Sequence, residues 1–271
     1  MKKNKLWAVI LCVLLVAAIV AAVVLLTRPK TEDSKDALAR IRERGTLIIG
    51  MEGNWSPWTY HDESDKLTGF EVEVGMLIAE GLGVKAEFQE APWDALLAGV
   101  DSRRFDIICN GVGYTEERAK SYSFSTPYVY SNKVLVVAES NEDIRSVDDL
   151  KGRTTANSAS STYAALAEQY GATLVPVDTL GETMDMLQQG RVDATINAQV
   201  SIADYLKEHP EAKIKTVQVL AGDPVAYPMH IGEDTKTLVA EVDKILDAAR
   251  KDGRLSALSI KYFGVDITKQ E

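Results

Sequence analysis

The residues best suited to bind an anion follow a predicted buried strand that ends near Asn110. Glycines at Gly111 and Gly113 leave backbone N–H groups open to a ligand, because no side chain covers them. Arg118 lies five residues further on and can bind a carboxylate through two parallel hydrogen bonds. This grouping predicts a site for a carboxylate, although Arg118 in a surface ion pair with Glu116 or Glu117 is the ordinary alternative.

Three further residues complete a possible site for an amino acid. Glu52 follows the predicted strand Thr46–Met51 and can bind an ammonium group, while Trp55 and Trp93 can form apolar walls around a side chain. A carboxylate clamp and an ammonium clamp between aromatic faces suit a zwitterion. Each residue also has a plain structural alternative, since tryptophans are often core residues and a glutamate after a strand is often solvated.

The chain uses one segment pattern twice, which predicts two similar lobes. Each copy runs from an apolar helix through an Arg-apolar-Asp step into a strand, and each copy ends on an asparagine, at Asn110 and Asn197. Ligands of open α/β sheets bind at the carboxyl ends of the strands, where both asparagines lie. Five polar residues of the second half can join this site: Asn157, Ser158, Ser160, Ser161 and Asn197. Each of them is more often a turn or cap residue than a ligand contact.

Strands and helices alternate along the chain. A short apolar run predicts a strand at 46–51, and further strands are expected at 85–89, 106–110, 134–137, 154–157, 173–177, 193–197 and 214–220. Helical spacing joins Phe70, Val74 and Ile78, with Gly83 as the C-terminal cap. The order is βαβαβ in the first half and again in the second, so we expect an α/β protein.

Composition and charge exclude several classes of partner. The hydrophobic content of 46% suffices for packed cores, and the formal charge is −10. Residues 1–30 carry five basic and no acidic side chains, so residues 31–271 carry 25 basic and 40 acidic ones. Such an acidic surface repels nucleic acid and does not favour binding flat on an anionic membrane.

An apolar segment near the N-terminus predicts export. Leu6 to Leu26 is a run of 21 residues without a charge, and a bilayer requires about 20. Three lysines precede it, which favours a cytoplasmic N-terminus and an exported remainder. The sequence leaves open an uncleaved anchor, a cleaved signal segment, or lipidation at Cys12, and we expect the anchor because no Ala-x-Ala exit is present.

The cysteines and histidines do not indicate a cofactor or a metal. Cys12 and Cys109 lie on opposite sides of the predicted membrane boundary, so they cannot pair, and Cys109 is expected to be a small buried apolar residue. His61, His209 and His230 are too scattered for a metal site. We therefore expect no metal and no cofactor.

Several motifs together resemble one family. They are Leu67-Thr68-Gly69-Phe70-Glu71-Val72-Glu73-Val74, Arg104-Phe105-Asp106, Thr115-Glu116-Glu117-Arg118, Phe124-Ser125-Thr126-Pro127-Tyr128, Gly190-Arg191-Val192-Asp193-Ala194-Thr195-Ile196-Asn197 and Lys261-Tyr262-Phe263-Gly264. As a set they look like the polar amino-acid-binding proteins (family 3 solute-binding proteins) of ABC importers. Asn110-Gly111-Val112-Gly113, with Lys151-Gly152 to Tyr163, most resembles the cystine-binding branch. The likeness covers about residues 40–268.

The resemblance implies a two-lobe periplasmic-binding-protein fold of type II, each lobe a βα sandwich, joined by two hinge strands. The implied divisions are an anchor or signal segment at 1–27, a linker at 28–39, lobe 1 at 40–130 plus 225–271, and lobe 2 at 131–224. The hinge crossings then fall near 128–132 and 221–226. The protein is expected to be a monomer on the extracytoplasmic face of the cell membrane or in the periplasm.

Carried over by position, the family implies ligand contacts in this chain. Arg118 would bind the α-carboxylate with backbone help from Gly111, Gly113 and Ser161, while Trp55 and Trp93 would enclose the side chain. Glu52 would lie near the amino group. Many relatives have an acid one residue after the strand-end asparagine, whereas this chain has Ala198. That departure puts the usual recognition of the α-amino group in doubt.

The expected function is capture of cystine or another polar amino acid and delivery to the membrane subunits of an ABC permease, without catalysis. An enzyme on the same scaffold, similar to cyclohexadienyl dehydratases, is the first alternative and would require a placed general acid. The ligand-sensing domain of a receptor is the second alternative. The sequence alone does not identify the amino acid or the permease.

Overall fold

The structure, a computed structural model, describes residues 36–270. The apolar segment Leu6–Leu26, Cys12 and the predicted linker as far as Lys35 lie outside the described residues. Among residues 36–270, no helix is both long enough and apolar enough to span a bilayer.

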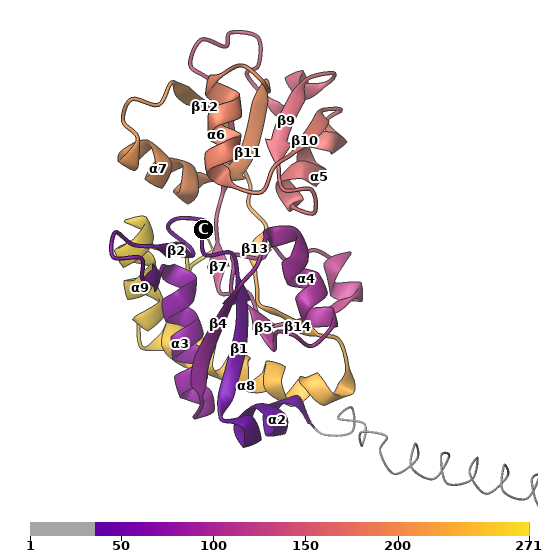
Figure 1. The fold of residues 1–271 in the computed structure, drawn as a ribbon, viewed down its shortest axis with the longest axis vertical. Coiled ribbons are helices and arrows are strands. Elements are labelled where there is room, and N and C mark those ends of the chain that lie inside the picture. The colour runs from indigo at the N-terminus through magenta and orange to yellow at the C-terminus, as the bar shows by residue number, and fades with distance from the viewer. Residues whose placement is uncertain (1–35, 271) are drawn as a thin grey trace, which may run out of the picture. The chain divides into compact units, whose positions relative to one another are not determined.

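The first lobe is built on a parallel three-stranded sheet in the order β4-β1-β5. Its strands are β1 (Thr46–Met51), β4 (Lys85–Glu90) and β5 (Ile107–Ile108). Its helices are α2 (Ala37–Arg44), α3 (Phe70–Leu82), α4 (Trp93–Asp101), α8 (Lys236–Lys251) and α9 (Arg254–Phe263). Figure 1 shows the C-terminal helices α8 and α9 beside α3, so the end of the chain returns to the lobe in which β1 lies.

The second lobe is built on a five-stranded sheet in the order β10-β9-β11-β8-β12. Its strands are β8 (Lys133–Ala138), β9 (Thr154–Asn157), β10 (Thr173–Pro176), β11 (Ala194–Ala198) and β12 (Ile214–Leu220). Its helices are α5 (Thr162–Gln169), α6 (Leu180–Gln188) and α7 (Gln199–Glu208). Strand β9 is parallel to β10 and β11, whereas β8 is antiparallel to both of its neighbours.

Strand β8 explains why the second lobe has a helical layer on each face. Val134 and Val136 pack in one apolar cluster with residues of α6, and Leu135 and Val137 pack in another with residues of α5. Successive side chains of a strand point to opposite faces, so an unbroken apolar run requires cover on both sides. The four residues thus fix a sandwich.

Two extended segments pass between the lobes side by side. Strand β7 (Val129–Tyr130) pairs antiparallel with β13 (Pro224–Val225), at the expected hinge positions (Figure 1). Next to them, β6 (Tyr122–Phe124) pairs with β14 (Pro228–His230), a ladder that the sequence did not predict. The remaining elements are the hairpin β2 (Tyr60–His61) and β3 (Leu67–Thr68) and the 3₁₀ turns η2 (Arg118–Lys120), η3 (Val147–Leu150) and η4 (Glu233–Thr235).

The aspartate of the repeated motif has the same structural task in both lobes. Asp106 accepts a hydrogen bond from the Ile48 N–H of β1 at 2.7 Å, and Asp193 accepts one from the Thr154 N–H of β9, also at 2.7 Å. Arg44 adds an ion pair to Asp106. In each lobe the aspartate of the repeat therefore binds the backbone of a neighbouring strand.

Most predicted elements agree with the structure, and two differ. The strands expected at 46–51, 154–157 and 214–220 have the same bounds in the structure, and Gly83 caps α3 with a φ of 76°. The strand expected over 106–110 is wrong in length, since β5 pairs with β1 only at Ile107 and Ile108 and the chain then turns at Gly111, where φ is 59°. Helix α2 begins at Ala37, inside the range expected to be linker.

Candidate functional site

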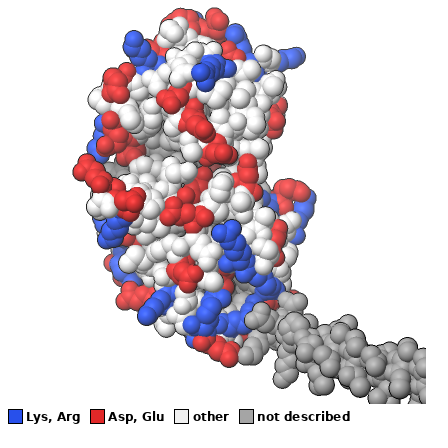
Figure 2. All heavy atoms as spheres, in the orientation of Figure 1, with Lys and Arg blue, Asp and Glu red and all other residues white. Residues whose placement is uncertain are grey.

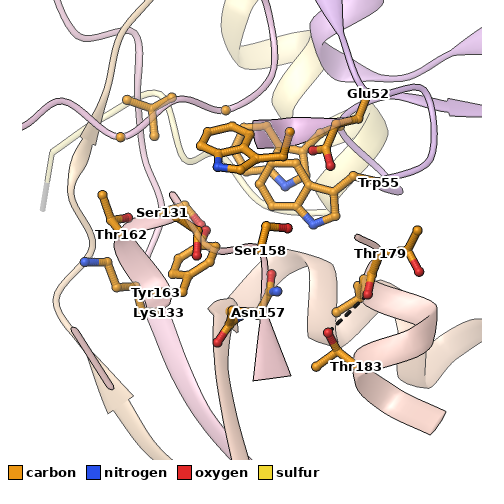
Figure 3. A pocket seen from close by; sticks show the side chains of 18 of the residues that line it. Glu52, Trp55, Ser131, Lys133, Asn157, Ser158, Thr162, Tyr163, Thr179 and Thr183 are labelled. Carbon is orange, nitrogen blue, oxygen red and sulfur yellow. Dashed lines mark hydrogen bonds between the residues drawn. The ribbon is translucent and has the colours of Figure 1, made fainter. Parts of the chain in front are cut away.

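A cavity of about 70 Å³ lies between the two sheets and is lined from both lobes (Figure 3). One buried water requires about 10–15 Å³ by the same measure, so the space suits several waters or a small ligand. The predicted site residues that line it are Glu52, Trp55, Trp93, Gly111, Gly113, Arg118, Asn157, Ser158, Ser161 and Asn197. Asn110 and Ser160 are not among the lining residues.

Tryptophan side chains from the first lobe form one wall of the cavity. The rings of Trp55 and Trp58 stack at 5.2 Å between centroids with an interplanar angle of 14°. The backbone N–H of Trp55 donates to the Thr59 carbonyl at 2.7 Å, which fixes the loop after β1. A side chain at Gly111 would contact the Trp55 ring at 2.9 Å, so glycine there lets the ring lie against the backbone.

Arg118 lies over Trp93, and its guanidinium binds two carbonyl groups. Its carbon Cζ is 5.5 Å from the Trp93 ring centroid, a cation–π contact. Nη1 donates to the Gly113 carbonyl at 2.9 Å, and Nη2 donates to the Ser160 carbonyl at 2.9 Å. Burial lowers the pKa of Arg118, yet arginine stays protonated in proteins. A guanidinium has five N–H donors, so donors remain for a ligand carboxylate.

Glu52 enters the cavity and is held by Asn110. Asn110 Nδ2 donates to Glu52 Oε2 at 2.6 Å, and the Glu52 backbone N–H donates to Asn110 Oδ1 at 2.8 Å. Burial raises the pKa of Glu52 to about 7, against the effect of the Asn110 hydrogen bond, which lowers it; the charge of Asp94 raises it further. Asn110 is fully buried, and its two hydrogen bonds with Glu52 position this carboxyl group.

The two glycines after β5 have different tasks. The Gly111 N–H donates to Glu71 Oε1 at 2.7 Å, so it is occupied. Gly113 pairs with Val225 in an isolated bridge, and its N–H has no acceptor within residues 36–270. The expectation that Gly111 gives an N–H to a ligand is therefore wrong, whereas Gly113 keeps one available.

Glu71 is a buried carboxyl group. The sequence predicted no role for it beyond its place in the motif at residues 67–74. It accepts hydrogen bonds from the hydroxyl groups of Tyr128 and Tyr227, which lie beside the two hinge strands, and from the Gly111 N–H. Burial raises its pKa to about 7, although all three hydrogen bonds lower it. Glu71 therefore ties the hinge to the turn on which the cavity glycines lie.

The predicted residues of the second lobe are largely engaged with backbone groups. Asn157 Nδ2 donates to the Ile196 carbonyl at 2.9 Å, and Asn197 Oδ1 accepts from the Ala198 N–H at 2.8 Å. Ser161 is the N-cap of α5, and its Oγ accepts from the Ala164 N–H at 3.1 Å. Ser160 lies outside the cavity, where its N–H and hydroxyl both bind Asp94 of the first lobe.

Other lining residues were missed by sequence reasoning. They include Trp58, Ser131, Lys133, Tyr163, Asp178 and Asp223. Burial raises the pKa of Tyr163, with the charges of Asp223 and Glu52 also raising it and that of Arg118 lowering it, so the phenol lies among these charged groups. Tyr163 lies two residues after Ser161, the N-cap of α5. Its place in the first turn of this helix could have identified it as a residue of the cavity. Nothing in the sequence brings Lys133 to Asp223.

Further side-chain contacts cross between the lobes beside the cavity, in addition to the bond of Arg118 to the Ser160 carbonyl. Asp94 Oδ1 accepts from the Ser160 N–H at 2.9 Å and from its hydroxyl at 2.5 Å. Ser56 Oγ donates to Asp204 Oδ2 at 2.7 Å, and Trp58 Nε1 donates to Ser201 Oγ at 3.0 Å. The lobes are therefore in contact on two sides of the ligand space.

Cys109 is unsuited to nucleophilic chemistry. It is fully buried, and burial raises the pKa of its thiol well above the usual value. Within residues 36–270, no group of three or more His, Cys, Asp or Glu side chains is arranged to hold a metal ion.

Figure 2 shows the charged side chains on one face of the molecule. Acidic side chains lie across the middle of this face, in agreement with the acidic composition, and basic ones are more frequent below.

Comparison with known proteins gives a consistent result. The model of the bacterial extracellular solute-binding proteins, family 3, matches residues 47–265. A probable amino-acid ABC transporter-binding protein of Haemophilus influenzae is 44% identical over 232 residues, which cover 85% of this chain and 89% of the relative. The L-cystine-binding protein TcyA of Bacillus subtilis is 40% identical over 235 residues, which cover 86% of this chain and 87% of the relative.

Solved structures agree on the fold. An ancestral arginine-binding protein bound to arginine has a TM-score of 0.76 at 32% identity, covering 82% of this chain and 99% of that chain. The ancestral amino acid-binding protein AncCDT-1, a precursor of cyclohexadienyl dehydratase, has a TM-score of 0.76 at 28% identity, covering 83% and 99%. The predicted two-lobe fold is confirmed, and the chain belongs to family 3 of the bacterial extracellular solute-binding proteins.

Proposed function

We propose that this protein captures a small amino acid, cystine or another polar one, outside the cytoplasm and delivers it to the membrane subunits of an ABC permease. The observation that carries the proposal is a cavity between two lobes that holds Arg118, acidic side chains and tryptophan walls together. The printed names of the relatives, amino-acid and L-cystine-binding proteins of transporters, support it.

In this proposal the ligand carboxylate binds Arg118 and the Gly113 N–H, with Ser161 at the start of α5 close by. Helix N-termini favour negative charge, and Ser161 is the N-cap residue of α5. Trp55 and Trp93 enclose the ligand side chain. Two acids that line the cavity, Glu52 and Asp223, are available for the ammonium group.

The proposed organisation of the chain is two lobes and a membrane tether. Residues 40–130 and 225–271 form lobe 1, residues 131–224 form lobe 2, and the apolar segment Leu6–Leu26 tethers the protein to the membrane. A tether holds the binding lobes near the permease at a raised effective concentration, so a modest docking affinity suffices. Mass spectrometry of protein from washed membranes should detect the N-terminal peptide. A mature chain that begins after Ala22 in the soluble fraction would contradict the tether.

A thermal-shift screen of the full chain tests the ligand class. The panel is the 20 amino acids, L-cystine and cationic analogues. A ligand at 100 times its dissociation constant stabilises the folded state by about 2.7 kcal/mol. For a domain of this size that corresponds to a rise in Tm of about 5–10 °C. If no amino acid shifts the Tm, the proposal is wrong.

A dehydratase is the second candidate, because Glu52 is buried in the cavity with a pKa of about 7, as a general acid requires. One structural relative is the precursor of cyclohexadienyl dehydratase. The relatives with the higher sequence identities are named as binding proteins, which favours transport. Incubation with a cyclohexadienyl acid separates the two functions: an absorbance rise from an aromatic product, lost in Glu52→Gln, would establish the enzyme.

A further inference from the structure

Asp223 occupies the space that a side chain at position 113 would fill. A Cβ built on Gly113 would lie 3.1 Å from Asp223 Oδ2 and 3.3 Å from its Cβ. The backbone is fixed there, because the Tyr114 N–H donates to the Pro224 carbonyl at 2.7 Å and the Ala226 N–H donates to the Val112 carbonyl at 3.1 Å. The glycine and the aspartate therefore fit each other.

The segment that carries Asp223 is also fixed from its other side. A Cβ on Gly222 would overlap the Ser131 carbonyl oxygen at 1.6 Å, so only glycine permits this approach of the two hinge segments. Asp223 thus reaches the cavity from a rigid position on a hinge crossing. Its side chain is 28% exposed, in the cavity that Arg118 and Gly113 also line.

Lys133 holds the Asp223 carboxylate. Its Nζ lies 2.9 Å from Asp223 Oδ2, and the lysine side chain is only 9% exposed. Lys133 begins β8, and its partner in register on β11 is Ala198. Residues opposite each other on antiparallel strands have Cβ atoms about 4.5–5.5 Å apart. The small Ala198 side chain thus leaves Lys133 without an acidic neighbour on β11, and Lys133 pairs with Asp223.

We propose that Asp223 is the acid that binds the ligand's ammonium group, with Lys133 as its positioning residue. This inference rests on the proposed function. An α-amino acid carries its ammonium group one carbon from its carboxylate, so the ammonium acceptor has to lie beside the carboxylate clamp. Asp223 lies over Gly113, whose carbonyl oxygen binds Arg118. One carboxylate oxygen, Oδ1, has no partner within residues 36–270, and a carboxylate accepts about four hydrogen bonds.

Glu52 has a different place in the cavity. Figure 3 shows Glu52 on the side of Trp55, across the cavity from Lys133. Its Oε2 is already bound to Asn110. With a pKa of about 7 it is only partly ionised at neutral pH, which makes it a weaker acceptor for an ammonium group. Glu52 is therefore the competing candidate, and Glu52→Gln is measured beside Asp223→Asn.

The test compares ligands with and without amino groups. Calorimetry on the full chain uses L-cystine against 3,3′-dithiodipropionate, and L-arginine against 5-guanidinopentanoate. We expect the wild-type protein to prefer at least one amino acid over its partner by at least about 100-fold. In Asp223→Asn this preference should fall below about tenfold, while the ligand without amino groups still binds. That retained binding shows that the variant is folded.

Two further variants make the result decisive. Asp148→Asn removes an exposed acid that does not line the cavity, so this control should keep the preference for the amino acid within about threefold of the wild-type value. Lys133→Met should weaken it by about tenfold and leave binding of the probe without amino groups within about threefold. An unchanged preference in Asp223→Asn, or its loss in Glu52→Gln instead, would overturn the inference while leaving the proposed function intact. A wild-type protein that binds neither L-cystine nor L-arginine would overturn it as well.

Discussion

Replacing Arg118 by alanine should remove most of the affinity for any ligand with a carboxylate. The guanidinium is buried over Trp93 and is held by the carbonyl groups of Gly113 and Ser160, so it is oriented before the ligand arrives. Losing one partner of a buried, hydrogen-bonded charge pair costs about 2–5 kcal/mol. That range corresponds to a loss of roughly 30-fold to 5,000-fold in Kd. A micromolar ligand would then bind at tens of micromolar or weaker.

Arg118→Lys separates charge from geometry. Lysine keeps the positive charge, but a single ammonium group does not reproduce the planar fork that binds two carbonyls and a carboxylate together. We therefore expect a loss between that of the alanine variant and the wild type. Isothermal calorimetry with the best ligand of the thermal-shift panel measures both. Arg104→Ala, which removes an arginine that lies over Phe105 and does not line the cavity, is the control.

Thermal melts of the unliganded variants establish that the fold is intact. If Arg118→Ala binds within threefold of the wild-type affinity, Arg118 is not the carboxylate clamp, and the assignment of the site to an amino acid loses its main support.

Three further predictions follow from the acids. The double variant Ala198→Asp/Asp223→Asn moves the acid to β11. It should restore at least tenfold of the affinity that Asp223→Asn loses, or about 1.4 kcal/mol by calorimetry. If the affinity does not recover, an acid at position 198 does not replace Asp223 as the acceptor of the ammonium group. The raised pKa of Glu52 means that the folded state still holds a proton between about pH 4.5 and 7 that the unfolded chain has released, so stability falls as pH rises through this window. Denaturant unfolding should show a flatter pH dependence for Glu52→Gln, and identical slopes would refute this. Glu71→Leu should cost at least about 3 kcal/mol of unfolding free energy, because three donors lose their acceptor at about 1–3 kcal/mol each, while Glu71→Gln should cost less; equal losses would show that the hydrogen bonds are unimportant.

Local patterns predicted much of the fold. The strands Thr154–Asn157 and Ile214–Leu220 were predicted with their observed bounds, and Gly83 marked the end of α3, because these features depend on neighbouring residues alone. The length of β5 was wrong because it is set by pairing with β1 and by the turn at Gly111. Pairing of this kind joins distant segments, and no local pattern reports it.

The same distinction applies to the site. Arg118, Trp55 and Glu52 were predicted because each lies within a few residues of a strand end or of a glycine turn. The ion pair of Lys133 with Asp223 joins residues 90 positions apart and depends on how the two hinge segments approach each other. The task of Gly111 was misjudged for a related reason, since its N–H is taken by the distant Glu71.

The contacts between the lobes have a consequence for transport. The bonds of Asp94 with Ser160, and of Trp58 with Ser201, join protein groups directly, so they stabilise the closed lobes independently of any bond to a ligand. The apparent Kd equals the intrinsic one divided by the fraction of molecules that are competent to bind, so the balance between open and closed forms scales affinity directly. An empty closed molecule also presents to the permease the surface of a loaded one. Stronger contacts between the lobes would therefore increase unproductive docking, in which a vacant carrier occupies the transporter and inhibits the uptake that it serves.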